Sequence, residues 1–263
     1  MLRWTECYSA ALNHPPAAPF AGLDNLASDF TDDPRIPVDA PSESEVLAAN
    51  TKLNNGRSPG ADGITAELLK HSSRTSVPLL VKLFASVWRS GKVPAEWKDG
   101  IITSLYKGKG SKTKCSSHRP ITLLSVPGKV FAQVMLQRLE PLLVEKRRPQ
   151  QSGFTKGRST SDAILTLRLL SDIHREFNRP LYAAYSDLKS AFDSVDREAL
   201  WKAVRGIGVP AILLNLIKDL YTGTCSRVRL VLATSHPALR PDLHLQNGHR
   251  SQAGLYSRPR LFL

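Results

Sequence analysis

The run from Tyr185 to Asp193 combines carboxylates with the pattern of a strand that ends at a turn. Residues 181–186 (LYAAYS) are apolar enough for a buried strand, and Asp187 follows directly. A carboxylate held rigidly at the rim of a sheet is what a divalent metal ion requires. Asp is also a common turn former, so capping of the next turn is the competing interpretation of Asp187. For Asp193 and Asp196 the favoured role is N-capping of the next helix.

A second group of candidate residues is basic and lies upstream. Residues 89–158 carry 15 basic and 4 acidic side chains, a balance suited to the phosphate backbone of a nucleic-acid duplex. Within this stretch the loop at 107–118 (KGKGSKTKCSSH) contains four lysines and no acidic residue, and Arg119 follows it. A solvated basic loop is the competing interpretation, and the charge pattern alone supports only nonspecific nucleic-acid binding. The loop lysines are Lys107, Lys109, Lys112 and Lys114.

Hydrophobic spacing and capping residues predict the elements that position these side chains. Residues 42–45 form a capping box, and the Pro-Gly and Asp-Gly pairs within 57–63 force a turn. Apolar residues recur at helical spacing from Val77 to Trp88, and Gly91 stands where a helix terminator belongs. Residues 100–106 (GIITSLY) have the composition of a buried strand. Further helices are expected over 126–146 with a break at Pro141, over 159–177 with Ser159 and Asp162 as its cap, over 195–205, and up to Tyr221.

The 263 residues suffice to bury a core as one large domain or two small ones. With 41% apolar and 22% charged residues, the composition excludes a collagen-like, low-complexity or wholly disordered chain. The net charge of +13 is uneven, because residues 1–50 carry 2 basic and 8 acidic side chains while residues 51–263 carry 34 and 15. The basic part therefore indicates a polyanionic partner.

The three cysteines, Cys7, Cys115 and Cys225, form neither an even disulfide set nor a C-x-x-C metal pair. We therefore expect reduced thiols in an intracellular protein, in the nucleus or the cytoplasm. No window approaches the ~18 apolar residues of a membrane span, and the start (MLRWTECYSA) lacks the apolar core of a signal peptide. Neither secretion nor membrane insertion is expected.

The motif D-L-K-S-A-F-D-S-V-D at 187–196 resembles the first catalytic motif of reverse transcriptases from non-long-terminal-repeat (LINE-type) retrotransposons. The opening R-W-T-E-C-Y resembles the stretch that joins the endonuclease and polymerase parts in that family. Four further motifs resemble the family in the right order, so the resemblance covers about residues 42–229. They are G-R-S-P-G-A-D-G-I at 56–64, L-Y-K-G-K-G at 105–110, H-R-P-I-T-L-L-S-V-P-G-K at 118–129 and Q-S-G-F-T-K-G-R-S-T-S-D at 151–162.

The resemblance implies an RNA-directed DNA polymerase that joins deoxynucleotides by two-metal nucleotidyl transfer with Mg²⁺ or Mn²⁺. Asp187 matches the first metal-binding Asp, and the Leu188 carbonyl would be a further ligand. Phe192 matches the steric gate that excludes a ribose 2′-hydroxyl, although a core aromatic is the competing interpretation. Lys107 and Arg119 match residues that grip the incoming triphosphate. An RNA template and a DNA primer are the implied partners, and their candidate contacts are Lys109, Lys112, Lys114, Lys156 and Arg158.

The implied fold is α+β, a right-hand polymerase fold with fingers, an incomplete palm and no thumb. The family's Gly-Val-Lys-Gln-Gly-Cys and aromatic-Ala-Asp-Asp segments do not occur in this sequence. Residues 249–259 (HRSQAGLYSRP) can be encoded so that a reading frame shifted by one nucleotide gives T-G-V-K-Q-G-C, which suggests an out-of-frame tail. The expected divisions are 1–41 as a linker or extended arm, 42–180 as fingers, 181–229 as a partial palm and 230–263 as an out-of-frame or disordered tail.

Two alternatives to an active polymerase follow from these missing segments. The chain could be a catalytically inactive, basic nucleic-acid-binding remnant. It could also be a pseudogene product that barely folds, because an interrupted palm sheet leaves a strand edge exposed.

Overall fold

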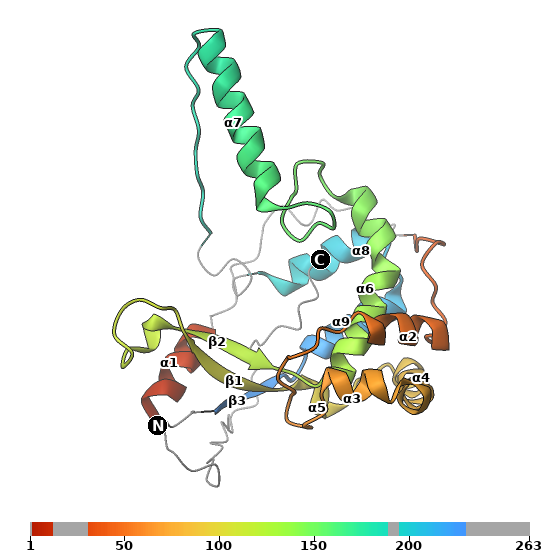
Figure 1. The fold of residues 1–263 in the computed structure, drawn as a ribbon. Helices are drawn as coiled ribbons and strands as arrows, with labels where there is room; N and C mark the ends of the chain where they lie inside the picture. The colour runs from red at the N-terminus through yellow and green to blue at the C-terminus, as the bar shows by residue number, and fades with distance from the viewer. Residues whose placement is uncertain (1, 13–30, 189–194, 230–263) are drawn as a thin grey trace.

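The computed structural model describes residues 2–12, 31–188 and 195–229, and Figure 1 shows their arrangement. Phe192, Asp193 and the predicted tail at 230–263 lie outside these residues. A three-stranded sheet lies beside a group of packed helices (Figure 1). The elements are α1 (Leu2–Leu12), α2 (Glu43–Thr51), α3 (Ala66–His71), α4 (Ser73–Ser90), α5 (Ala95–Lys98), β1 (Asp99–Tyr106), η2 (Cys115–Ser117), β2 (His118–Leu123), α6 (Val126–Lys146), α7 (Thr160–Glu176), α8 (Arg197–Gly206), α9 (Ala211–Tyr221) and β3 (Cys225–Arg229).

The main core lies between the helices and is centred on aromatic rings. The Phe131 ring of α6 contacts Phe84 of α4 at 5.2 Å and Trp97 of α5 at 5.3 Å between ring centroids. Edge-to-face contacts of this kind add to the free energy gained by burying the rings. The predicted helix over 77–88 is confirmed as part of α4, which Gly91 ends in the left-handed conformation with φ of 64°.

The predicted helix caps are confirmed where the structure describes them. Glu45 accepts a hydrogen bond from the Ser42 backbone N–H at 2.9 Å and thus completes the capping box of α2. The Asp196 carboxylate accepts from the backbone N–H groups of Glu198 and Ala199 at the start of α8. The predicted break at Pro141 is wrong, since α6 continues to Lys146. Proline removes only one backbone donor, and the burial of α6 from Val126 to Leu142 stabilises the helix on both sides of Pro141.

The sheet has the strand order β2-β1-β3. β1 confirms the predicted strand over 100–106 and pairs antiparallel with β2, with Leu105 opposite Arg119. β3, which the sequence pattern did not reveal, runs parallel to β1 and places Ile101 opposite Arg227. A parallel neighbour 126 residues further along the chain leaves no local turn signal, so sequence spacing does not reveal it.

The first 41 residues contain more structure than the linker or extended arm expected for them. Helix α1 packs its Tyr8 side chain, 2% exposed, against Ile102 and Val228 of the sheet. Further along, Ile36 is part of the main core. The Trp88 indole N–H donates to the Val38 carbonyl at 2.6 Å, which ties this stretch to α4.

α7 stands apart from the packed helices and projects away from them (Figure 1). Ser159 and Asp162 form its predicted cap, with the Ser159 N–H donating to the Asp162 carboxylate at 2.6 Å. None of its residues is buried. Asn178, with φ of 47°, turns the chain, and residues 178–188 return alongside the helix (Figure 1).

Among the described residues, no helix is both long and apolar enough to cross a bilayer.

Candidate nucleotide and nucleic-acid face

Lys107 and Arg119 lie on the same face of the β1–β2 hairpin. Arg119 stands opposite Leu105 in the pairing of β1 with β2. The Lys107 backbone N–H donates to the Ser117 carbonyl at 2.9 Å, so Lys107 stands opposite Ser117 in the same register. Because side chains alternate along strands, Lys107 and Arg119 are diagonal neighbours on one face. Both side chains are exposed. Two positive side chains at neighbouring positions of one face suit a ligand that carries several phosphate oxygens.

Hydrogen bonds within the connection between β1 and β2 hold its backbone. The Tyr106 hydroxyl donates to the Gly110 carbonyl at 2.6 Å, and the Lys107 ammonium donates to the Ser116 carbonyl at 2.7 Å. Gly110 has φ of 82°, a conformation that side-chain-bearing residues rarely adopt. Lys112 lies over the Tyr106 ring with its nitrogen 5.8 Å from the centroid. The loop therefore presents its lysines from an ordered backbone.

The opposite face of the hairpin is covered by α1. The Tyr8 hydroxyl donates to the Ser104 hydroxyl at 2.7 Å, and burial raises the pKa of Tyr8. The Trp4 ring meets the His118 ring edge-on at 4.8 Å. With one face covered in this way, the face that carries Lys107 and Arg119 is the one open to a ligand.

The structure corrects the expectation of reduced thiols for two of the three cysteines. Cys7 of α1 and Cys115 of η2 form a disulfide across a sequence separation of 108 residues. The packing of α1 on the sheet brings them together, and nothing in their spacing along the chain indicates it. Cys225 is free and exposed.

β3 adds two arginines to this surface that sequence reasoning missed. Its register places Arg227 beside Ile101 and Arg229 beside Thr103, on the side of the sheet away from α1. Both side chains are half-buried. The alternation of Arg227 with Arg229 around the buried Val228 is a period-two signal that could have revealed them.

Asp187 is not at the rim of the sheet, contrary to the expectation. Residues 181–188 are exposed and belong to none of the three strands. A strand forms only where its backbone groups find a neighbouring strand, and none of the described strands lies against this segment. Leu188 is 72% exposed. The described residues also contain no group of three or more His, Cys, Asp or Glu side chains that could hold a metal ion.

Lys156 and Arg158 are exposed in the turn that precedes α7. Gly157 between them has φ of 74°, and the Arg158 N–H donates to the Thr155 carbonyl at 3.1 Å. The structure places both side chains toward solvent, together with Lys109, Lys112 and Lys114.

The motifs at 56–64 and 118–129 pack against each other. A Cβ on Gly60 would lie 2.6 Å from the Leu124 carbonyl carbon and from the Ser125 nitrogen, so the backbones of 56–64 and 118–129 touch there. Lys129 lies close by, where burial lowers the pKa of its ammonium and the charge of Asp62 opposes that shift. The 56–64 turn therefore packs against the backbone between the end of β2 and the start of α6.

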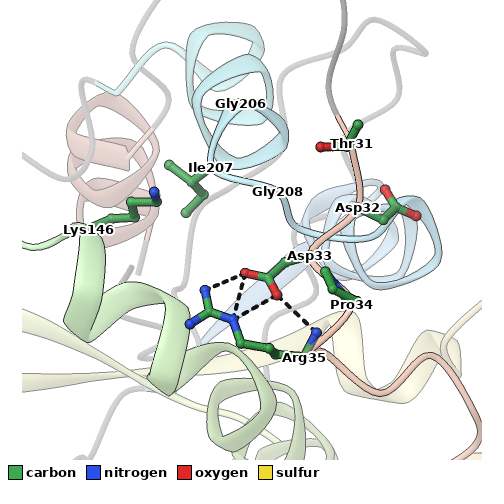
Figure 2. A pocket seen from close by; sticks show the side chains of 9 residues that line it. All are labelled: Thr31, Asp32, Asp33, Pro34, Arg35, Lys146, Gly206, Ile207 and Gly208. Carbon is green, nitrogen blue, oxygen red and sulfur yellow. Dashed lines mark hydrogen bonds and ion pairs between the residues drawn. The ribbon is translucent and has the colours of Figure 1, made fainter.

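A cavity of about 470 Å³ opens on another part of the molecule, and none of the predicted site residues lines it. Figure 2 shows Arg35 donating to Asp33 at its edge, and these hydrogen bonds lower the pKa of Asp33 to about 2. The Asp33 N–H donates to the Gly208 carbonyl at 2.8 Å. The cavity is lined by Thr31, Asp32, Asp33, Pro34, Arg35, Lys146, Gly206, Ile207 and Gly208.

Comparison with known proteins decides the family. A model described as reverse transcriptase (RNA-dependent DNA polymerase) matches residues 107–249, more than half of the chain. This chain belongs to the reverse transcriptase family. The matched region begins at Lys107, contains Arg119 and Asp187, and extends past residue 230.

The relatives confirm the resemblance to retrotransposon enzymes. A putative 115 kDa protein in type-1 retrotransposable element R1DM of Drosophila melanogaster is 35% identical over 178 residues, 66% of this chain and 17% of that protein. The probable RNA-directed DNA polymerase from transposon X-element, also of Drosophila melanogaster, is 26% identical over 207 residues, 76% of this chain and 22% of that protein. This reverse transcriptase chain therefore spans about a fifth of the relatives it matches.

Proposed function

We propose that this chain supplies the nucleotide-binding part of a retrotransposon RNA-directed DNA polymerase. The observation that carries the proposal is that the exposed side chains of Lys107 and Arg119 lie as neighbours on the open face of the hairpin. A bidentate guanidinium beside an ammonium suits a triphosphate, because negative charge builds up on the leaving pyrophosphate as its bond to the α-phosphorus breaks. In this proposal residues 42–180 are fingers, residues 181–229 begin the palm, and an RNA template paired with a DNA primer lies along the basic surface.

Asp187 is the proposed carboxylate ligand of a catalytic metal ion, with the Leu188 carbonyl beside it. Both oxygens are the hard donors that Mg²⁺ and Mn²⁺ prefer. Two-metal catalysis needs further carboxylates within reach, and the described residues hold no such group. The donor set among the described residues is therefore incomplete. Phe192 remains the proposed selector of deoxynucleotides.

A second candidate function is nucleic-acid binding without catalysis. The exposed position of Asp187, outside the sheet, favours it. In that case the basic surface would hold RNA through phosphate contacts, and the affinity would fall steeply with salt.

Primer extension on an RNA template with Mg²⁺ separates the two functions. Polymerase activity predicts extension that Asp187→Ala abolishes and that Asp172→Ala, a matched change at an exposed acid on α7, leaves intact. Salt-sensitive RNA binding with no extension would support the binding function instead. A chain that neither extends a primer nor binds RNA would refute both.

A further inference from the structure

A second cavity, of about 320 Å³, lies where α1 meets the loop between β1 and β2. Both partners of the Cys7–Cys115 disulfide line this cavity, and both are half-buried. A small thiol that enters the cavity therefore meets the disulfide directly. The other lining residues come from α1 and from the loop, and they are Trp4, Thr113, Lys114 and Ser116.

The loop side of the cavity is positively charged. Lys114 is exposed and lines the cavity, and the loop at 107–118 contains no acidic residue. The acid nearest in sequence to either cysteine is Glu6, which lies on the α1 side. An anionic thiol is therefore attracted to the Cys115 side of the disulfide. The exposed hydroxyls of Thr113 and Ser116 add hydrogen-bonding groups that suit a carboxylate.

The disulfide is a large part of what holds α1 beside the hairpin (Figure 1). Among the side chains of α1 that the structure describes, Tyr8 is the one that is buried. Trp4 adds its edge-on contact with His118. A helix of 11 residues is only marginally stable without packing. Opening the disulfide therefore leaves α1 weakly attached.

The same cross-link adjoins the groups that hold Lys107. Cys115 is the first residue of η2, and the next two residues supply both acceptors for Lys107. The Ser116 carbonyl accepts from the Lys107 ammonium at 2.7 Å, and the Ser117 carbonyl accepts from the Lys107 backbone N–H at 2.9 Å. Opening the disulfide removes the anchor of η2, so the support of Lys107 is weakened.

We propose that this cavity is a thiol–disulfide exchange site for a small thiol that carries carboxylates, with glutathione as the probe of that class. The thiolate attacks the Cys115 sulfur while Lys114 pairs with one of its carboxylates. The bond between the Cys7 and Cys115 sulfurs breaks, and its electron pair goes to the Cys7 sulfur, which takes a proton from water. The products are a mixed disulfide at Cys115 and a free thiol at Cys7, so α1 is released from the hairpin.

Mass spectrometry of the full chain tests the exchange in a Cys225→Ser background, which removes the third cysteine. The chain is treated with one equivalent of reduced glutathione, quenched with acid and alkylated. The expected products carry glutathione on Cys115 and an alkyl group on Cys7, because acid protonates the thiolates and stops further exchange. Glutathione on Cys7 instead, a disulfide that opens only after denaturation, or a purified chain without the cross-link would overturn the proposal.

Lys114→Ala tests the contact with the carboxylate of the thiol. At low ionic strength it should slow the exchange with glutathione by about threefold, as expected for the loss of one exposed ion pair. It should leave the exchange with 2-mercaptoethanol, a neutral thiol, unchanged. Lys109→Ala is the matched control, because it removes an exposed lysine of the same loop that does not line the cavity. Equal slowing with both thiols, or by both variants, would contradict the role of Lys114.

The effect of the exchange on nucleotide binding rests on the proposed function, whereas the exchange itself does not. Glutathione should lower the retention of a labelled deoxynucleotide by about threefold in the cross-linked chain, because Lys107 loses part of its support. It should leave Cys7→Ser unaffected, since that variant has no disulfide to open. Exchange at Cys115 without a change in retention would refute this coupling. A chain that binds no nucleotide in either state would contradict the proposed function, and the mass measurement would still decide the exchange site.

Discussion

Arg138 joins two helices that are far apart in the sequence. Its guanidinium donates to both carboxylate oxygens of Glu45, at 2.6 and 2.8 Å, and its third nitrogen reaches the carbonyls of Pro37 and Asp39. Its side chain is 4% exposed. Arg138→Ala should lower the free energy of unfolding by about 3 kcal/mol, because it leaves Glu45 without its partner. Urea denaturation measures the effect.

The matched control for Arg138→Ala is Arg89→Ala, which removes an exposed arginine from α4. It should change stability by less than about 0.5 kcal/mol. If the two variants had the same free energy of unfolding, the ion pair between Arg138 and Glu45 would make no net contribution to stability.

The same pair predicts how stability depends on pH. Hydrogen bonds from Arg138 lower the pKa of Glu45 from 4.5 to about 2. Because the folded-state pKa is the lower one, the stabilisation is complete above about pH 4.5 and is lost as the pH falls toward 2. The stability difference between wild type and Glu45→Gln should therefore be constant near neutrality and shrink across that acid range. A difference that does not change with pH would contradict this assignment.

At the scale of elements, the contact between the 56–64 turn and the start of α6 depends on Gly60. Gly60→Ala should cost about 1–3 kcal/mol, because its Cβ would lie 2.6 Å from the backbone of Leu124 and Ser125. Gly153→Ala is the control, since its Cβ would meet only the Gln151 side chain at 3.5 Å. Chemical denaturation of both variants should separate them, and equal stability would show that the two backbones can move apart.

The Cys7–Cys115 disulfide fixes α1 on the sheet face opposite Lys107. A cross-link that closes a loop this long should contribute about 2–4 kcal/mol to stability. Reductant should therefore lower the urea midpoint of the wild type and leave Cys7→Ser unaffected. Cys225→Ser should respond as the wild type does, because Cys225 lies outside the cross-link. A wild type insensitive to reductant would show that the cross-link contributes nothing.

Across the whole molecule, the features that the sequence predicts correctly are those that depend on residues close together in the chain. α4 with its Gly91 terminator, the cap of α7 and the strand β1 all follow from local spacing. Features that depend on distant partners do not follow from spacing. The pairing of β3 with β1, the cross-link of Cys7 to Cys115 and the position of α1 each join segments about a hundred residues apart or more.

In the candidate site, too, the outcome differs between residues placed by local structure and residues that need a distant partner. Lys107 and Arg119 come from one face of the β1–β2 pair, whose antiparallel register brings them close, and their contact with a triphosphate stays a prediction. Asp187 was expected at the end of a buried strand from local composition alone. Composition shows that a segment can form a strand, but a neighbouring strand decides whether it does.

The central claim is that the open face of the hairpin holds the triphosphate of an incoming nucleotide. It is tested most directly by retention of a labelled deoxynucleotide on a complex of the chain with an RNA template and a DNA primer that lacks its 3′-hydroxyl, in Mg²⁺. Lys107→Ala/Arg119→Ala should weaken retention at least about tenfold, as expected for the loss of two charge-assisted contacts. Lys52→Ala/Arg74→Ala, which removes two exposed charges outside the hairpin, should retain the nucleotide as the wild type does. Equal retention by the two double variants would contradict the claim.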